Sequence, residues 1–148
     1  MDPVVVFLAS GAYVGYLPAA PGTFGSVLAL PLLAWLGGLD LAPAVVVGVV
    51  VAASLLAMPV CHRAGRIFGQ SDSPRIVLDE ICGMLCAGAL LPATGRNLVL
   101  VFLAFRFFDI VKPFPAGYVD RHVKNGAGVV ADDLVAGIYA HLVVRMLA

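Results

Sequence analysis

The sequence predicts an all-α protein, a multi-helix integral membrane bundle whose functional site lies at the cytoplasmic helix ends. Hydrophobic residues make up 61% of the 148 residues and charged residues only 12%, which is far from the balance of a soluble domain. Residues 41–60 contain no charge and match the thickness of a bilayer core. Five of the nine acids lie at the ends of other apolar stretches, where a membrane helix meets water.

Apolar stretches at residues 27–36, 41–60, 75–91, 98–111 and 129–147 are predicted to be helices. The apolar segment at residues 4–17 is too short for a span and is expected in the membrane interface. Residues 18–26, 37–40, 92–97 and 113–128 are rich in Pro, Gly or Asn, and residues 61–75 are polar, so these segments are predicted connections. The length suits a single domain, residues 1–148.

Positive charges gather in two of these connections, which are therefore expected on the cytoplasmic side. The hairpin of residues 27–36 and 41–60 brings residues 18–26 to the same side. Nine acids balance nine Lys and Arg residues, so nothing points to a nucleic-acid partner. The N-terminus lacks a positive leader region and is expected to be retained. The basic residues of the two loops are Arg63, Arg66, Arg75, Lys112, Arg121 and Lys124.

A charge triplet ends the apolar stretch at residues 98–111. Arg106, Asp109 and Lys112 stand at i, i+3 and i+6, so one helix face carries all three. Pro113 then prevents much continuation of the helix. An interfacial anchor, with an internal ion pair, is the simplest interpretation of the triplet alone.

Carboxylates on three helix ends are predicted to meet at the cytoplasmic face. One helix begins there with two acids, a second ends there with one, and a third begins there with two. An acid at the bilayer centre costs about 2.5–3.5 kcal/mol, and several together also repel one another. Ordinary ion pairing would need more cations than Arg106 and Lys112 supply. The converging acids are Asp79, Glu80, Asp109, Asp132 and Asp133.

A hard divalent cation would balance these acids. Oxygen ligands without adjacent His or Cys favour Mg²⁺ first and Mn²⁺ or Ca²⁺ next, and Mg²⁺ is often completed by a substrate phosphate. Arg106 and Lys112 are candidate phosphate clamps. The loop that holds Thr23, Gly25 and Ser26 leads into a helix N-terminus, which can bind an anion, although capping of that helix by Thr23 or Ser26 near residue 27 explains the loop equally well.

Four segments together resemble the phosphatidylglycerophosphatase A family of bacterial lipid phosphatases. The segments cover residues 15–26 (GYLPAAPGTFGS), 76–84 (IVLDEICGM), 105–115 (FRFFDIVKPFP) and 126–137 (GAGVVADDLVAG). The resemblance extends over nearly the whole chain and departs from the family pattern at Asn125 and Val130. It implies Mg²⁺-dependent removal of the terminal phosphate from phosphatidylglycerophosphate, yielding phosphatidylglycerol, at the bacterial inner membrane.

The resemblance also implies roles for individual residues. Arg106 and Lys112 would take part in catalysis and also bind substrate, together with Thr23, Gly25 and Ser26. Asp79, Asp109 and Asp133 would be both catalytic residues and metal ligands. The implied metal ligands are Asp79, Glu80, Asp109, Asp132 and Asp133. No oligomeric state is predicted.

Two mechanisms fit these residues. Either water activated by Mg²⁺ attacks the phosphorus with Asp109 as base, which we favour, or an aspartate attacks and forms a phospho-aspartyl intermediate. His122 is preferred over His62 and His141 for protonating the leaving group. Two rival functions remain, an ion channel or transporter lined by acids and a non-catalytic scaffold. The cysteines, Cys61, Cys82 and Cys86, are expected to be inert and buried.

Overall fold

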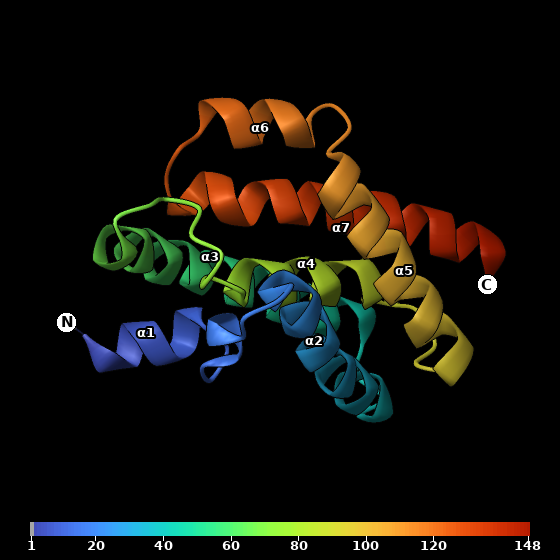
Figure 1. The fold of residues 1–148 in the computed structure, drawn as a ribbon. Coiled ribbons are helices and arrows are strands. Elements are labelled where there is room, and N and C mark those ends of the chain that lie inside the picture. The colour runs from blue at the N-terminus through green and yellow to red at the C-terminus, as the bar shows by residue number, and fades with distance from the viewer. Residues whose placement is uncertain (1) are drawn as a thin grey trace.

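The computed structural model describes residues 2–148, whose regular elements are all helices and which contain no strand (Figure 1), so the predicted all-α class is confirmed. Seven α-helices and one 3-10 turn follow one another along the chain. The elements are α1 (Pro3–Ala9), η1 (Val14–Tyr16), α2 (Pro21–Gly38), α3 (Pro43–Phe68), α4 (Leu78–Gly88), α5 (Gly95–Val111), α6 (Ala116–His122) and α7 (Gly126–Leu147).

The short helix α4 is the centre of the bundle. It packs most extensively on α7 and also contacts α2, α3 and α5, and it lies between α2 and α7 in Figure 1. One face of α4 contributes Ile81 and Met84 to a core shared with α2, α5 and α7. Another face contributes Cys82 to a second core shared with α1, α3 and α7. Because other helices cover both faces of α4, its residues beyond the first turn pack in the two cores and are apolar.

Two glycines allow α4 and α7 to approach closely. A Cβ atom added at Gly83 would lie 2.8 Å from the carbonyl oxygen of Asp133, and one added at Gly137 would lie 3.1 Å from the Cβ of Cys86. Larger side chains at either position would separate the two backbones. The spacing of each glycine four residues after an acid therefore places the acids of both helices beside this close crossing.

Among the described residues, three helices are long and apolar enough to cross a membrane, namely α2, α3 and α7. Their outward faces carry exposed apolar side chains, as at Leu55, Leu56 and Leu142, which would contact lipid. By contrast, α4 has 11 residues and a length of about 16 Å, roughly half of a bilayer core. The stretch at residues 75–91 was predicted as a longer helix, and its shorter observed form excludes it from these candidate spans.

Several predicted boundaries were wrong. Helix α2 begins at Pro21 and not near residue 27, because Pro21 occupies the first helical turn, where its missing N–H is not needed. Helix α3 continues past residue 60 to Phe68, so the predicted polar connection starts only at Gly69, whose positive φ of 72° ends the helix. The predicted loop at residues 113–128 contains the helix α6, and α7 starts at Gly126, earlier than expected.

Candidate active site

Three carboxylates meet where α4 begins. Asp79 and Glu80 lie in the first turn of α4, and Asp133 lies in the second turn of α7. Each offers one carboxylate oxygen, and these oxygens all lie within 4.8 Å of one another. Asp79 and Asp133 are buried and Glu80 is half-buried. We call Asp79, Glu80 and Asp133 the carboxylate cluster.

Within the described residues, the cluster lacks enough partners for its oxygens. Asp79 Oδ1, Glu80 Oε2 and Asp133 Oδ2 are buried and accept no hydrogen bond. Burial raises the pKa of Asp79 well above its usual range, and the charges of Glu80 and Asp133 raise it further. Burial also raises the pKa of Glu80, and the charge of nearby Asp109 acts in the same direction. Because unsatisfied buried carboxylates are costly and these offer only oxygen, the cluster fits a hard divalent cation such as Mg²⁺.

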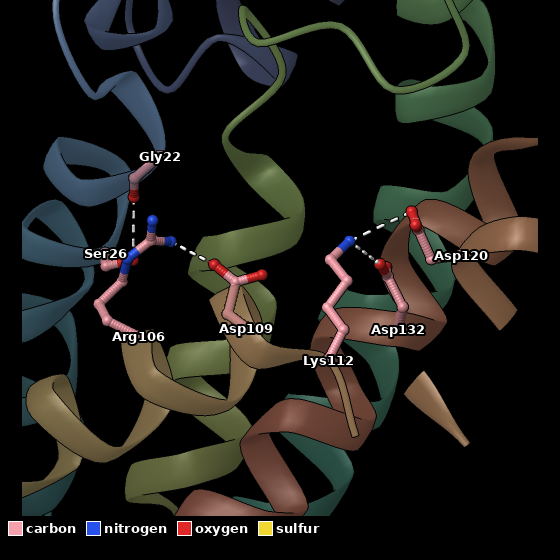
Figure 2. Close-up of polar contacts among 7 residues, drawn as sticks. All are labelled: Gly22, Ser26, Arg106, Asp109, Lys112, Asp120 and Asp132. Carbon is pink, nitrogen blue, oxygen red and sulfur yellow. Dashed lines mark hydrogen bonds and ion pairs between the residues drawn. The ribbon is translucent and has the colours of Figure 1, made fainter. Parts of the chain in front are cut away.

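Arg106 lies beside the cluster on the last turns of α5. Its Nη1 forms an ion pair with Asp109 Oδ2, three residues further along the same helix (Figure 2). Its Nε is buried and has no hydrogen-bond acceptor among residues 2–148. The side chain is therefore held in place by Asp109 and keeps a buried donor available. The predicted ion pair between Arg106 and Asp109 is therefore present.

The start of α2 closes another side of the site. A Cβ atom added at Gly22 would overlap Glu80 Oε1 and lie 3.5 Å from Arg106 Nη1, so a larger residue there would displace the Glu80 carboxylate. Ser26 Oγ donates a hydrogen bond to the carbonyl oxygen of Gly22 at 2.9 Å (Figure 2). Gly25 packs against Val77 in the turn that precedes α4. These contacts bring the helix N-terminus up to Glu80 and Arg106.

The predicted side-chain cap of this helix was wrong. The residue before α2 is Ala20, in the left-handed region with φ of 47°, and no side chain caps the helix. Ser26 is buried in the second turn, where its hydroxyl bonds to its own helix. Thr23 is half-buried in the first turn. The N–H groups of Thr23 and Phe24 donate to the carbonyl oxygen of Ala20, so Gly22 is the residue of this first turn whose N–H has no acceptor among the described residues.

Lys112 and Asp132 form a separate ion-pair group. Lys112 ends α5 in the left-handed region, and its Nζ lies 2.7 Å from Asp132 Oδ2 and 3.1 Å from Asp120 Oδ1 (Figure 2). Partial burial opposes the charge of Lys112, but the two carboxylates outweigh it and raise the pKa of Lys112 above its usual range. The structure therefore brings Asp132 to Lys112, outside the carboxylate cluster. Asp120, on α6, was missed because its helix was predicted to be a loop.

The three histidines lie outside the cluster of carboxylates. His122 Nδ1 lies 2.8 Å from the carbonyl oxygen of Tyr118, and its ring stacks on the Tyr118 ring at the solvent-exposed surface. His141 Nδ1 lies 3.2 Å from the carbonyl oxygen of Ala87, on the part of α4 remote from its acids. His62 lines a cavity at the end of α3. A role for His122 in protonating the leaving group therefore stays a prediction.

Comparison with known protein families identifies the chain's relatives. The family model for phosphatidylglycerophosphatase A matches residues 7–148. The chain belongs to the phosphatidylglycerophosphatase A family. It is 38% identical over 144 residues to phosphatidylglycerophosphatase A of Haemophilus influenzae, covering 93% of this chain and 84% of the relative. It is 35% identical over 135 residues to phosphatidylglycerophosphatase A of Escherichia coli, covering 88% of this chain and 76% of that protein.

A more distant relative carries another substrate in its name. A Bacteroides thetaiotaomicron protein named "Putative phosphatidylinositol-3-phosphatase" is 29% identical over 149 residues, covering 95% of this chain and 91% of the relative. No solved structure matched the chain. The four segments that carry the resemblance to the phosphatidylglycerophosphatase A family lie at the start of α2, the start of α4, the end of α5 and the start of α7. These are the helix ends that build the site.

Proposed function

We propose that this chain hydrolyses the terminal phosphomonoester of phosphatidylglycerophosphate to phosphatidylglycerol and phosphate, with Mg²⁺ as the preferred cation and Mn²⁺ as the second choice. One observation carries the proposal. Within residues 2–148, buried carboxylate oxygens without hydrogen-bond partners lie next to Arg106, whose buried Nε also lacks a partner. A divalent cation and a phosphate group would satisfy both, and membership of the phosphatidylglycerophosphatase A family supports this substrate.

Asp79, Glu80 and Asp133 are the residues that would hold the cation. When bound, it supplies Lewis acidity to the phosphoryl group. Arg106 would donate hydrogen bonds to the phosphoryl oxygens, with its guanidinium oriented by Asp109. Because that charge is already fixed in the folded protein, it stabilises the transferring group without reorganisation during the reaction. At the start of α2, the N–H of Gly22 would contribute one further donor to the same anion.

The attacking group is proposed to be water, with Asp109 as the base. One oxygen of Asp109 faces Arg106, and the other points away from it (Figure 2), so it remains available to accept a proton. Attack by an aspartate, with hydrolysis of a phospho-aspartyl intermediate, is the alternative route. Lys112 and Asp132 are proposed to support the site through their mutual ion pair, which fixes α5 against α7.

The proposed location is the bacterial inner membrane, with the site facing the cytoplasm. Apolar helices α2, α3 and α7 support membrane insertion. The end of α3 and the segment before α7 carry Arg63, Arg66 and Lys124, and positive residues favour the cytoplasmic side. The acids gather at one end of α4, whereas a channel would distribute them along its path through the membrane.

Phosphate release by purified protein in mixed micelles tests the proposal. The substrates are phosphatidylglycerophosphate, phosphatidic acid, phosphatidylinositol 3-phosphate and water-soluble glycerol 3-phosphate, each with Mg²⁺ or with excess EDTA. We expect Mg²⁺-dependent release that is fastest from phosphatidylglycerophosphate and slow from the soluble ester, which cannot approach along the membrane. Release that persists in EDTA would refute the metal requirement. Faster release from phosphatidylinositol 3-phosphate would refute the substrate assignment, and absence of release would favour a scaffold.

A further inference from the structure

A cavity of about 200 Å³ lies where α3 ends and α7 begins. Its lining contains basic and neutral polar side chains and glycines, and it contains no carboxylate among the described residues. We call it the basic cavity. Its side chains come from His62, Arg66, Gln70, Ser71, Lys124 and Asn125.

The two cations of the basic cavity are brought together by tight helix packing. Arg66 lies in the last turn of α3, and Lys124 lies two residues before α7 begins. A Cβ atom added at Gly126 would lie 2.7 Å from the Cβ of His62, so the start of α7 rests directly on α3. Asn125 caps α7 by accepting a hydrogen bond from the N–H of Gly128 at 3.0 Å. The position of Lys124 relative to Arg66 is therefore set by ordered backbone on both sides.

Neither cation is neutralised within the protein. No ion pair among residues 2–148 involves Arg66 or Lys124. Some other basic residues have partners: Arg106 and Lys112 pair with carboxylates, and Arg75 lies over the rings of Tyr16 and Phe68. Arg66 also lines a neighbouring pocket that contains Asp2, but the basic cavity itself has two cations and no acid in its lining, which favours an anion there.

We propose that the basic cavity binds a phosphate-bearing anion, and that its occupant is the headgroup phosphodiester of an anionic lipid. The cavity lies at the ends of α3 and α7, two of the helices able to cross a membrane, and so at the depth where headgroups are found. It is distinct from the active site, because Gly126 precedes Asp133 of the carboxylate cluster by about 10.5 Å along α7. The proposal goes beyond the proposed function and does not depend on it.

Native mass spectrometry of the full chain in detergent can measure this binding. The protein is incubated with equal amounts of phosphatidylglycerol and phosphatidylcholine, both phosphodiesters of which only the first has a net charge. The test variants are Arg66→Gln, Lys124→Gln and their combination. Arg63→Gln is the matched control, since Arg63 lies one turn earlier on α3 and does not line the cavity. Arg66→Lys keeps the positive charge and tests whether the guanidinium group itself is needed.

We expect the wild type to retain phosphatidylglycerol preferentially, and each removed cation to reduce that preference about five-fold. Arg63→Gln and Arg66→Lys should behave almost as the wild type. Equal retention by the wild type and the double variant would overturn the proposal, as would an equal loss in Arg63→Gln, which would indicate diffuse surface charge. Variants are compared only where circular dichroism shows wild-type helix content, and if one Gln variant does not fold, the other single Gln variant carries the test.

A second arm separates lipid from free phosphate. Inorganic phosphate is added in EDTA, and thermal unfolding is followed for the wild type and for Arg66→Gln/Lys124→Gln. We expect little stabilisation of either, because the lipid is the proposed occupant. A shift in the wild type that the double variant loses, combined with unchanged lipid retention, would overturn the lipid assignment in favour of free phosphate. Hydrolysis of the phosphomonoester substrate is measured separately, so a negative result for lipid binding at the basic cavity would not contradict the proposed catalytic function.

Discussion

Lys112 Nζ lies 2.7 Å from Asp132 Oδ2 and joins the end of α5 to the second turn of α7. The same ammonium group reaches Asp120 on α6 at 3.1 Å. Asp132 is 4% exposed, and its neighbour Asp133 belongs to the carboxylate cluster. Successive helical residues point about 100° apart, so these two acids face different partners. The contact to Lys112 therefore helps to set the rotation of α7 that directs Asp133 towards the cluster.

Replacing Lys112 with Met should lower stability. The change leaves the buried carboxylate of Asp132 without its cation, and we expect a loss of about 1–3 kcal/mol in the free energy of unfolding because Lys112 is itself partly exposed. Adding Asp132→Asn to the Lys112→Met variant should recover part of the loss in a double-mutant cycle. Thermal unfolding in detergent measures this. Unchanged stability together with a large rise in KM would instead make Lys112 a phosphate clamp.

Asp133→Asn should reduce activity by orders of magnitude, because the amide keeps the size but removes the charge proposed to hold the cation. Steady-state phosphate release across a Mg²⁺ titration measures the effect, and high Mg²⁺ should restore part of the rate if affinity is lost. Asp40→Asn is the control, since Asp40 is exposed, distant from the cluster and at a positive φ that Asn accepts. A wild-type rate and Mg²⁺ requirement in Asp133→Asn would contradict its role as a ligand.

Arg106→Lys should reduce the rate by one to two decades. Lysine keeps the charge but loses the planar group that contacts Asp109 while presenting Nε, and a lost charge-assisted hydrogen bond corresponds to about 1.5–3 kcal/mol. The Mg²⁺ requirement should stay close to that of the wild type. Steady-state kinetics test this prediction by measuring kcat, KM and the Mg²⁺ concentration at half-maximal activity. A shifted Mg²⁺ midpoint would show that Arg106 acts mainly as a partner of the carboxylates.

Mg²⁺ should stabilise the folded protein, because only folding gathers the carboxylate cluster. At a free concentration one hundred times its Kd, the expected gain is about 2.7 kcal/mol. Thermal unfolding is compared in millimolar Mg²⁺ and in excess EDTA, for the wild type and for Asp79→Asn. The wild type should unfold at a higher temperature in Mg²⁺, and the variant should show a smaller shift. Superimposed wild-type curves would argue against a cation site.

Gly83→Ala should destabilise the crossing of α4 and α7. Its added methyl group would lie 2.7 Å from Phe105 Cζ and 2.8 Å from the Asp133 carbonyl oxygen, so the helices must separate, at a cost of about 1–3 kcal/mol. Activity should fall with stability because Asp133 moves. Gly48→Ala is the control, since nothing lies within 4 Å of its added methyl group and alanine favours a helix. Equal unfolding temperatures for the two variants would contradict this account of the crossing.

The acids could be predicted from the sequence because helix periodicity and charge in an apolar chain are local signals. Asp79 and Glu80 stand at the start of a hydrophobic stretch, and the positive loops indicate which helix ends share a side. The partners of each acid could not be predicted in this way. Asp132 and Asp133 are adjacent in sequence, and only the rotation of α7 assigns one to Lys112 and the other to the cluster.

The start of α2 and the helix α6 escaped prediction for physical reasons. Proline was interpreted as excluding helix at residues 18–26, but Pro21 occupies the first turn, where proline is favoured. Helix α6 has only seven residues, between a proline-rich turn and the Asn125 cap, and is too short for a clear hydrophobic period. Asp120 belongs to this helix, so its contact with Lys112 could not be anticipated.

The carboxylate cluster draws two ligands from α4 and the third from α7, the final helix in chain order. During synthesis, a nascent chain that has reached the end of α5 already contains Asp79, Glu80 and Arg106, but it still lacks Asp133 and the Lys112–Asp132 contact. The proposed cation site is therefore complete only after α7 has been synthesised. Prematurely released chains would carry no competent centre, and a pulse-labelled chain should acquire metal-dependent protease resistance only after its last helix has inserted.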